Sequence, residues 1–181
     1  MAMRRLDLHL RILNKDILKR LLLYGYEIVL VDQLMDVDIP VDKPLVVRRI
    51  GIASHLKDIK RIPSPILHIN PTKEEVRILI DVIRRYPNRV KAVEVDLIDM
   101  GRYFQTNLLA TLCKLSIYLL SRGIPIFVSS GARREEDIVP PEILIWLTSS
   151  FSFKWNPLKS KPYKQFYAFL DKVIFSYEKG S

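Results

Sequence analysis

The strongest constraint on the fold is an alternation, along most of the chain, between short runs rich in branched apolar residues and segments with helical spacing. Residues 6–10 alternate apolar and polar side chains, as a strand with one buried face does. Strands and helices that alternate in sequence are typical of a parallel sheet with helical crossovers. The expected strands are residues 6–10, 27–31, 44–52, 65–69, 92–97 and 124–128.

Capping residues predict where several helices begin and end. Asn14 can cap a helix that runs to about Tyr24, with Gly25 as its stop. Thr72 and Glu75 fit a capping box at the start of another helix. Further helices are expected at residues 104–122 before Gly123, from Pro140–Pro141 to Trp146, and near the C-terminus on the apolar face of Phe166, Phe169, Leu170 and Val173.

The chain length of 181 residues suits one domain with a sizeable core. An open doubly wound sheet and a barrel both satisfy the alternation. No glycine-rich fingerprint follows the first strand, which disfavours a dinucleotide-binding domain. We therefore expect a single α/β domain over residues 1–181, with residues 151–181 as a C-terminal helical extension. In that extension aromatic side chains crowd together with lysines, so it can pack on the domain, stack on bases or anchor a protein partner.

The charge of the chain favours an anionic partner. Lysine and arginine outnumber aspartate and glutamate by 29 to 20, a formal net charge of +9. The basic residues gather between residues 43 and 61, between residues 84 and 91, and after Ser150. Each cluster alone can serve solubility, but three clusters with few compensating acids favour nucleic acid, anionic lipid or a polyphosphate as the partner.

Cysteine content and hydropathy predict the compartment. Cys113 is the single cysteine, so the chain can form neither an internal disulfide nor a thiolate metal site. The first residues lack the apolar stretch of a signal peptide, and the apolar segments are shorter than a membrane-spanning helix requires. We expect a cytoplasmic protein without a membrane partner.

Polar residues at the expected strand ends are the candidates for chemistry. The pair Asp7 and His9 resembles the opening motif of metal-dependent phosphoesterases of the polymerase-and-histidinol-phosphatase type, which continue with a second histidine where this chain has Arg11. A guanidinium would repel a metal, and the chain has only three histidines. We expect no metal ligands and no catalytic residues here. Asp7 and His9 would then pair with polar groups inside the mouth of a barrel.

The segment from Ile124 to Arg134 is the most informative stretch. A strand ends in Ser129, Ser130 and a glycine, followed by Arg133 and Arg134. Such a turn can direct backbone N–H groups and hydroxyls at a phosphate, with the arginines adding charge. It can equally be an ordinary tight turn with solvated arginines.

The sequence Ser129-Ser130-Gly131-Ala132, followed by Pro141-Glu142-Ile143-Leu144, resembles the signature of ribonuclease P protein component 3 of archaea. The likeness extends from about Val93 to Leu147. Family members usually carry an arginine near Val139, which this chain lacks. The chain is also short for a full eight-fold barrel, so we expect some helices to be missing.

The resemblance implies an irregular TIM-barrel-like fold, related to the metal phosphoesterases but without their site. It implies a subunit of an endoribonuclease in which RNA removes the 5′ leader of precursor tRNA, with Mg²⁺ on the RNA and no cofactor on the protein. The implied partners are the catalytic RNA, precursor tRNA and a small ferredoxin-like protein subunit. A metal-dependent phosphoesterase and a protein-only scaffold are the alternatives. The expected RNA-binding residues are Arg133, Arg134, Ser129, Ser130, Arg102, Arg48, Arg49 and Arg61.

Overall fold

The computed structural model describes residues 5–39, 45–49, 51–58, 62–102, 108–151 and 160–178. Strands and helices alternate through much of this range, as the sequence predicts. The strands are β1 (Leu6–Leu13), β2 (Ile28–Leu34), β3 (Leu45–Arg48), β4 (Ala53–His55), β5 (Ile66–His68), β6 (Ala92–Asp96) and β7 (Ile126–Ser129). The helices are α1 (Lys15–Leu23), α2 (Lys73–Arg85), α3 (Leu97–Arg102), α4 (Leu108–Ser121), α5 (Pro141–Phe151) and α6 (Lys161–Glu178), with short 3-10 turns η1 (Leu56–Asp58) and η2 (Glu135–Asp137).

The strands form two parallel sheets. One has the order β1-β2-β3 and the other β4-β5-β6-β7. The sheets meet beyond the end of β7, where the N–H of Gly131 donates to the carbonyl of His9 at 2.9 Å and the N–H of Arg11 to that of Ala132 at 3.0 Å. The described residues therefore give a parallel α/β architecture in two sheets, and they do not show one closed barrel.

One predicted strand is divided in the structure, and one helix was not predicted. The single strand expected over residues 44–52 is wrong: β3 ends at Arg48, the carbonyl of Arg49 accepts the N–H groups of Ile52 and Ala53, and β4 begins in the other sheet. The turn contains Gly51 at φ +76°, a conformation that glycine adopts without strain. Before the helix expected over residues 104–122, α3 begins directly at the end of β6; residues 103–107 lie outside the described residues.

The predicted caps explain the helix boundaries. The side chain of Asn14 accepts the N–H groups of Asp16 and Ile17, and Gly25 at φ +68° follows the last turn of α1. Thr72 accepts the N–H of Glu75 at 3.2 Å, but the carboxylate of Glu75 bonds to Asn70 instead of closing the predicted capping box. Among the described helices, none combines the length and the hydropathy that a membrane crossing would need.

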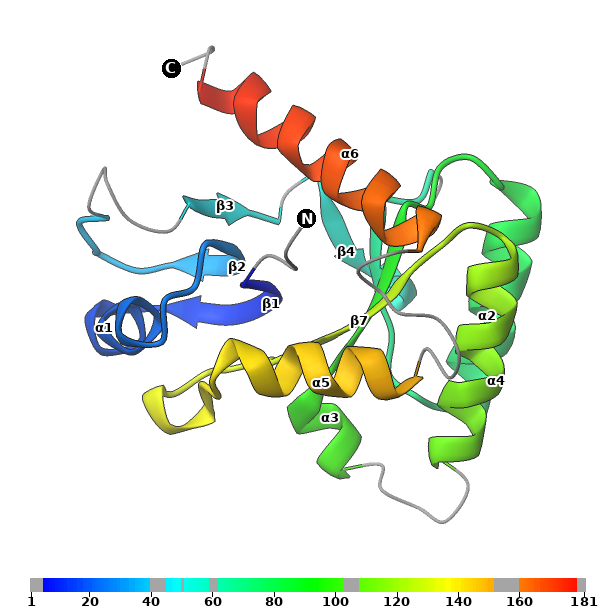
Figure 1. Cartoon of the computed structure of the whole chain (residues 1–181), viewed down its shortest axis with the longest axis horizontal. Helices are drawn as coiled ribbons and strands as arrows, with labels where there is room; N and C mark the ends of the chain where they lie inside the picture. Colours follow the sequence, from blue (N-terminus) through cyan, green and yellow to red (C-terminus); the bar gives the residue numbers. More distant parts are fainter. Residues whose placement is uncertain are drawn as a thin grey trace.

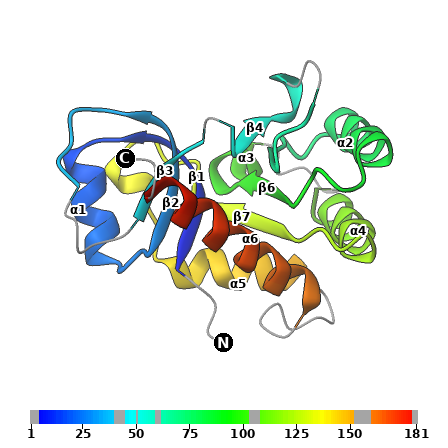
Figure 2. The ribbon, with the colours of Figure 1, turned by 90° about the horizontal axis from the view of Figure 1, so that it is seen from above.

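The strands separate two apolar layers. On one face, Val93 and Val95 of β6 belong to the core shared with α1, α2, α4 and α5. On the other face, Ala92 belongs to a second core under α6, which contributes Tyr163, Phe166, Tyr167 and Leu170. Figure 1 shows α6, in orange and red, crossing above the strands, and Figure 2 shows it lying over their middle when seen from above. The expected C-terminal helix is thus confirmed.

Candidate functional site

A cluster of ionisable and polar side chains lies toward the carboxyl ends of β2 and β4–β7 and beside the first half of β1. On β6 the face that starts with Ala92 under α6 continues with Glu94 and Asp96, because alternate residues share a face. The strand pairing shifts between Asp7 and Leu10, and this irregularity accompanies the inward placement of His9. The strand-end cluster comprises Asp7, His9, Arg11, Asp32, Arg49, His55, His68, Glu94, Asp96, Asp99, Ser129 and Ser130.

His9 is the hub of the strand-end cluster. Its ring is fully buried, with Nδ1 2.7 Å from Asp96 Oδ1 and Nε2 2.9 Å from Asp32 Oδ2. Burial lowers the pKa of His9, but the hydrogen bonds to Asp32 and Asp96 outweigh it and raise the pKa to about 9. His9 is therefore an imidazolium at neutral pH that links β1 to β2 and β6.

Two arginines neutralise carboxylates inside the cluster. Arg49 donates to Asp32 at 2.9 Å, to the carbonyl of Leu8 at 2.8 Å and to Glu94. Nη2 of Arg11 donates to Asp96 at 2.9 Å and to Asp99 at 2.7 Å. Removing one member of such a buried pair would leave the other charge uncompensated. Arg11, which occupies the position of the second histidine in the motif that the sequence resembles, therefore pairs with carboxylates of β6 and α3.

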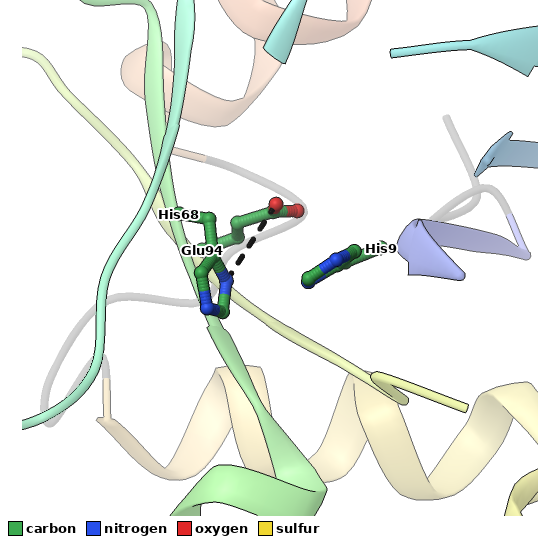
Figure 3. Close-up of side chains that lie close together, drawn as sticks. All are labelled: His9, His68 and Glu94. Atoms are coloured by element: carbon green, nitrogen blue, oxygen red, sulfur yellow. Dashed lines mark ion pairs between the residues drawn. The ribbon is translucent and has the colours of Figure 1, made fainter. Parts of the chain in front are cut away.

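His68 is placed differently from His9. It is buried, and its Nδ1 lies 3.7 Å from Asp96 Oδ1 and 3.9 Å from Glu94 Oε1, too far for a hydrogen bond. Within the described residues this nitrogen has no hydrogen-bond partner. Burial, the largest cause, lowers the pKa of His68 to about 4, so the ring is neutral at neutral pH. The rings of His9 and His55 each lie 4.5 Å from that of His68, and Figure 3 shows His9 facing His68 and Glu94.

The carboxyl groups of the cluster differ in the direction in which their pKa is shifted. Burial raises the pKa of Asp7 to about 6, against the bonds it accepts from Ser130 and the N–H of His9. Burial likewise raises the pKa of Glu94 to about 6, against the opposing charge of Arg49. Asp96 is also buried, but its hydrogen bond to His9 and the nearby positive charges lower its pKa to about 2. The cluster thus brings an acid-base array and possible metal ligands together in one place.

The Ser129-Ser130-Gly131 turn closes the cluster instead of opening toward solvent. Ser129 Oγ donates to Glu94 at 3.2 Å, and the N–H of Ser130 donates to Asp7 at 3.1 Å. Gly131 has φ +66°, and a Cβ there would lie 2.5 Å from Cγ of Asp96. Glycine is therefore required at this position both by the backbone and by the close approach of Asp96.

The residues predicted to bind RNA do not form one surface. Ser129, Ser130 and Arg49 are buried and bonded within the protein, so their side chains are not presented at the surface. Arg133 and Arg134 are exposed; Arg134 pairs with Glu136 and Asp137, whereas no acid within the described residues pairs with the guanidinium of Arg133. Arg48 lies in β3 and Arg102 in α3, with side chains outside the described set, and Arg61 lies outside the described residues.

Sequence reasoning missed three members of the strand-end cluster. Asp32 follows the apolar part of β2. Because acidic residues also follow the apolar runs of other strands, this position could have predicted Asp32 as a member of the cluster. His55 was hidden by the expectation of one strand over residues 44–52, since it ends the separate strand β4. Asp99 comes from α3, whose start directly after β6 had no signal in the pattern. Asp7 and His9 pair with buried polar groups, as expected, although the described residues do not show the closed barrel in whose mouth this pairing was predicted.

A second feature lies at the opposite, amino-terminal ends of β6 and β7. A groove of about 510 Å³ runs between α6, the loop before β6 and the loop before β7. Its lining contains Lys91, Arg122 and Lys172, all exposed, and no acidic residue. A neighbouring hollow of about 490 Å³ shares Asn88 and Lys91 with it and adds Arg89. Together they form the basic groove.

No protein-family model, curated protein or solved structure matches this chain. The resemblance in the Ser129 to Leu144 region therefore stays an expectation from the sequence, and the geometry of the strand-end cluster and the basic groove carries the functional inference below.

Proposed function

We propose that this chain is a protein subunit of ribonuclease P, which binds the catalytic RNA and assists removal of the 5′ leader from precursor tRNA. The observation that carries the proposal is the basic groove, whose lining has cationic side chains and no acid. Phosphodiester backbones bind such surfaces through lysine and arginine, with release of counterions. Phe169, half-buried in the lining of the groove, offers an aromatic ring against which an unpaired base can stack.

The strand-end cluster supports a non-catalytic protein in a particle whose chemistry belongs to RNA. Arg11 and Arg49 occupy the carboxylates that an enzyme of the phosphoesterase type would direct at a metal or a substrate. The buried serines of the signature segment bond to Asp7 and Glu94, so this part of the resemblance has a structural role.

An irregular barrel is the fold that accompanies this proposal. The two sheets are adjacent through the Gly131–His9 and Arg11–Ala132 hydrogen bonds, and Arg49 bridges β2 and the start of β4 through its backbone. The seven described strands would then form a ring in sequence order, with one strand fewer than a full eight-fold barrel. In such a ring, the strand-end cluster would lie at the carboxyl ends of the strands, and α6 would cover their amino ends.

Reconstituted cleavage of precursor tRNA at low Mg²⁺ tests the proposal. The reaction contains the catalytic RNA and the small ferredoxin-like subunit from the same source, with and without this chain. We expect its omission to depress cleavage, because protein cations offset repulsion between RNA segments, and we expect the chain alone to cleave nothing. Cleavage by the chain alone that survives nuclease treatment would instead support the phosphoesterase alternative.

RNA affinity measured against salt concentration locates the binding surface. The triple variant Lys91→Glu, Arg122→Glu, Lys172→Glu should flatten the plot of log K against log salt by about 0.7 to 0.9 for each phosphate that the protein no longer neutralises. The double variant Arg133→Glu, Arg134→Glu tests the RNA-binding residues predicted from the sequence at the other end of the strands. Reversal of Arg84 and Arg85, exposed residues on α2, is the matched control. An unchanged slope in the triple variant would contradict the groove as the RNA site.

A further inference from the structure

The basic groove has an apolar wall between its cationic side chains. In the larger of its two hollows, the lining includes the half-buried ring of Phe169 and the exposed residues Pro87 and Ala168. Lysine and arginine alone suffice to attract the phosphates of a double helix, whose bases are stacked inside and present no free face. An apolar wall that contains an aromatic ring therefore suits a nucleic acid whose base faces are accessible.

The cations of the larger hollow come from three different segments. Lys91 lies in the loop before β6, Arg122 in the loop before β7, and Lys172 on α6. The guanidinium of Arg122 lies 5.6 Å from the centroid of the Tyr118 ring, a contact that holds this cation close to the end of α4. Cations on several sides of one hollow can follow the backbone of a single strand into it.

The size of the two hollows suits single nucleotides. Their volumes are about 510 and 490 Å³, and Asn88 and Lys91 line both of them. Sites that enclose small ligands have volumes of about 300–1,000 Å³, so each hollow has the size of a site for a small ligand and cannot enclose a double helix. The exposed amides of Asn88 and Gln165 can both donate to and accept from base edges. A phosphate at Lys91 would connect a nucleotide in one hollow to a nucleotide in the other.

We infer that the basic groove binds an unpaired segment of RNA, with one base stacked on Phe169 and the flanking phosphates held by the surrounding cations. This inference rests on the proposed function and adds the class of RNA structure that the groove selects. Proteins recognise single strands by stacking bases on aromatic rings, because every base has a π face that pairing and stacking otherwise cover. A double helix reaches only the rim of the groove, through its phosphates.

The test compares the affinity of the full chain for a short RNA without internal pairing and for the same strand paired with its complement, by fluorescence anisotropy at one salt concentration. We expect the single strand to bind about 10-fold more tightly. Phe169→Leu should weaken binding of the single strand by about 5- to 100-fold and leave binding of the duplex unchanged, whereas Phe169→Tyr should retain both. The matched control is Trp146→Leu, which removes an exposed aromatic ring of α5 outside the lining of the groove.

The outcomes separate this inference from the proposed function. Equal or tighter binding of the duplex, together with loss of affinity in the triple variant Lys91→Glu, Arg122→Glu, Lys172→Glu, would overturn the inference and leave the proposed function standing. Unchanged affinity in the triple variant would contradict the groove as the RNA site and therefore both. Equal losses in Phe169→Leu and Trp146→Leu would overturn the stacking on Phe169.

Photocrosslinking of the unmodified chain decides if Phe169→Leu does not fold. The short single strand carries 5-iodouridine, which reacts with aromatic side chains, and the crosslinked residue is identified by peptide mapping. A crosslink to Phe169 supports the inference, and its absence rejects it. The same label is then placed in the catalytic RNA or in precursor tRNA within the reconstituted particle, to identify which of them supplies the strand. A crosslink from the short strand but from neither of these RNAs would support the single-strand site and contradict the ribonuclease P assignment.

Discussion

Arginine has opposite roles at the two ends of the strands. At the carboxyl ends, Arg11 and Arg49 are enclosed and fixed by carboxylates, with side chains only 16% and 4% exposed. At the amino ends, Arg89 and Arg122 are exposed beside grooves whose linings contain no acid. The comparison shows that the surplus of basic residues alone does not locate a binding surface. Only the arginines without nearby carboxylates can attract an anionic partner.

The largest effect should come from removing a buried arginine. Arg49→Met leaves Glu94 without its paired cation and removes one of the two cations at Asp32, which should lower the free energy of unfolding by about 3–5 kcal/mol. Arg122→Met at the other end is the matched control and should change it by less than about 0.5 kcal/mol, as exposed substitutions do. Urea denaturation followed by circular dichroism measures both. Equal decreases in the free energy of unfolding of the two variants would contradict the different roles of arginine at the two ends of the strands.

A pair of glycines gives a sharper comparison. Gly131 and Gly123 both have positive φ, at +66° and +75°, so alanine should introduce about 1–3 kcal/mol of strain at either. Only at Gly131 would the new Cβ also meet Asp96, 2.5 Å from its Cγ, whereas nothing lies within 4 Å at Gly123. We expect Gly131→Ala to be clearly the more destabilising in thermal melts. Similar melting temperatures would mean that Asp96 moves aside easily.

The attachment of α6 depends on a smaller interaction. The hydroxyl of Tyr163 is buried and donates to the carbonyl of Ile126 at 2.8 Å. Tyr163→Phe should lower the free energy of unfolding by about 1 kcal/mol, because one hydrogen bond is removed while the ring stays packed. The RNA affinity of Tyr163→Phe should equal that of the unmodified chain, because α6 stays packed and the lysines and arginines that line the basic groove are unchanged. Loss of RNA affinity with normal stability would show that the hydroxyl acts directly in binding.

The smallest effect concerns pH at the exposed turn after β7. Asp137 accepts the N–H groups of Arg133 and Arg134, and these bonds outweigh its desolvation and lower its pKa below the usual range of an aspartate. A lowered carboxyl pKa stabilises the fold above the unfolded value and loses that contribution as pH falls through the folded value. Asp137→Asn should therefore be slightly less stable than the unmodified chain at pH 7, with a smaller difference at pH 3. A difference that persists at pH 3 would contradict this origin.

The sequence by itself determined the elements and much of the layering. Asn14, Thr72, Gly25 and Gly123 define helix boundaries through local hydrogen bonds and backbone conformation, which depend on few neighbours. The alternation of strands and helices predicted parallel pairing, and the apolar face near Phe166 predicted a packed C-terminal helix. The positions of His68 and Asp96 at strand ends agree with the strands expected over residues 65–69 and 92–97. Asp7 and His9, in contrast, lie in the first half of β1, because this strand continues to Leu13 instead of ending near residue 10.

Only the tertiary structure decided which charges meet. Arg49 reaches Glu94 across 45 positions, and Arg11 reaches Asp96 across 85, so no local pattern could distinguish these buried arginines from exposed ones. The division of the strand expected over residues 44–52 moved His55 to the cluster, and the meeting of three loops and α6 created the basic groove. Burial and electrostatic compensation depend on distances between distant segments, and the sequence does not contain those distances until the chain is folded.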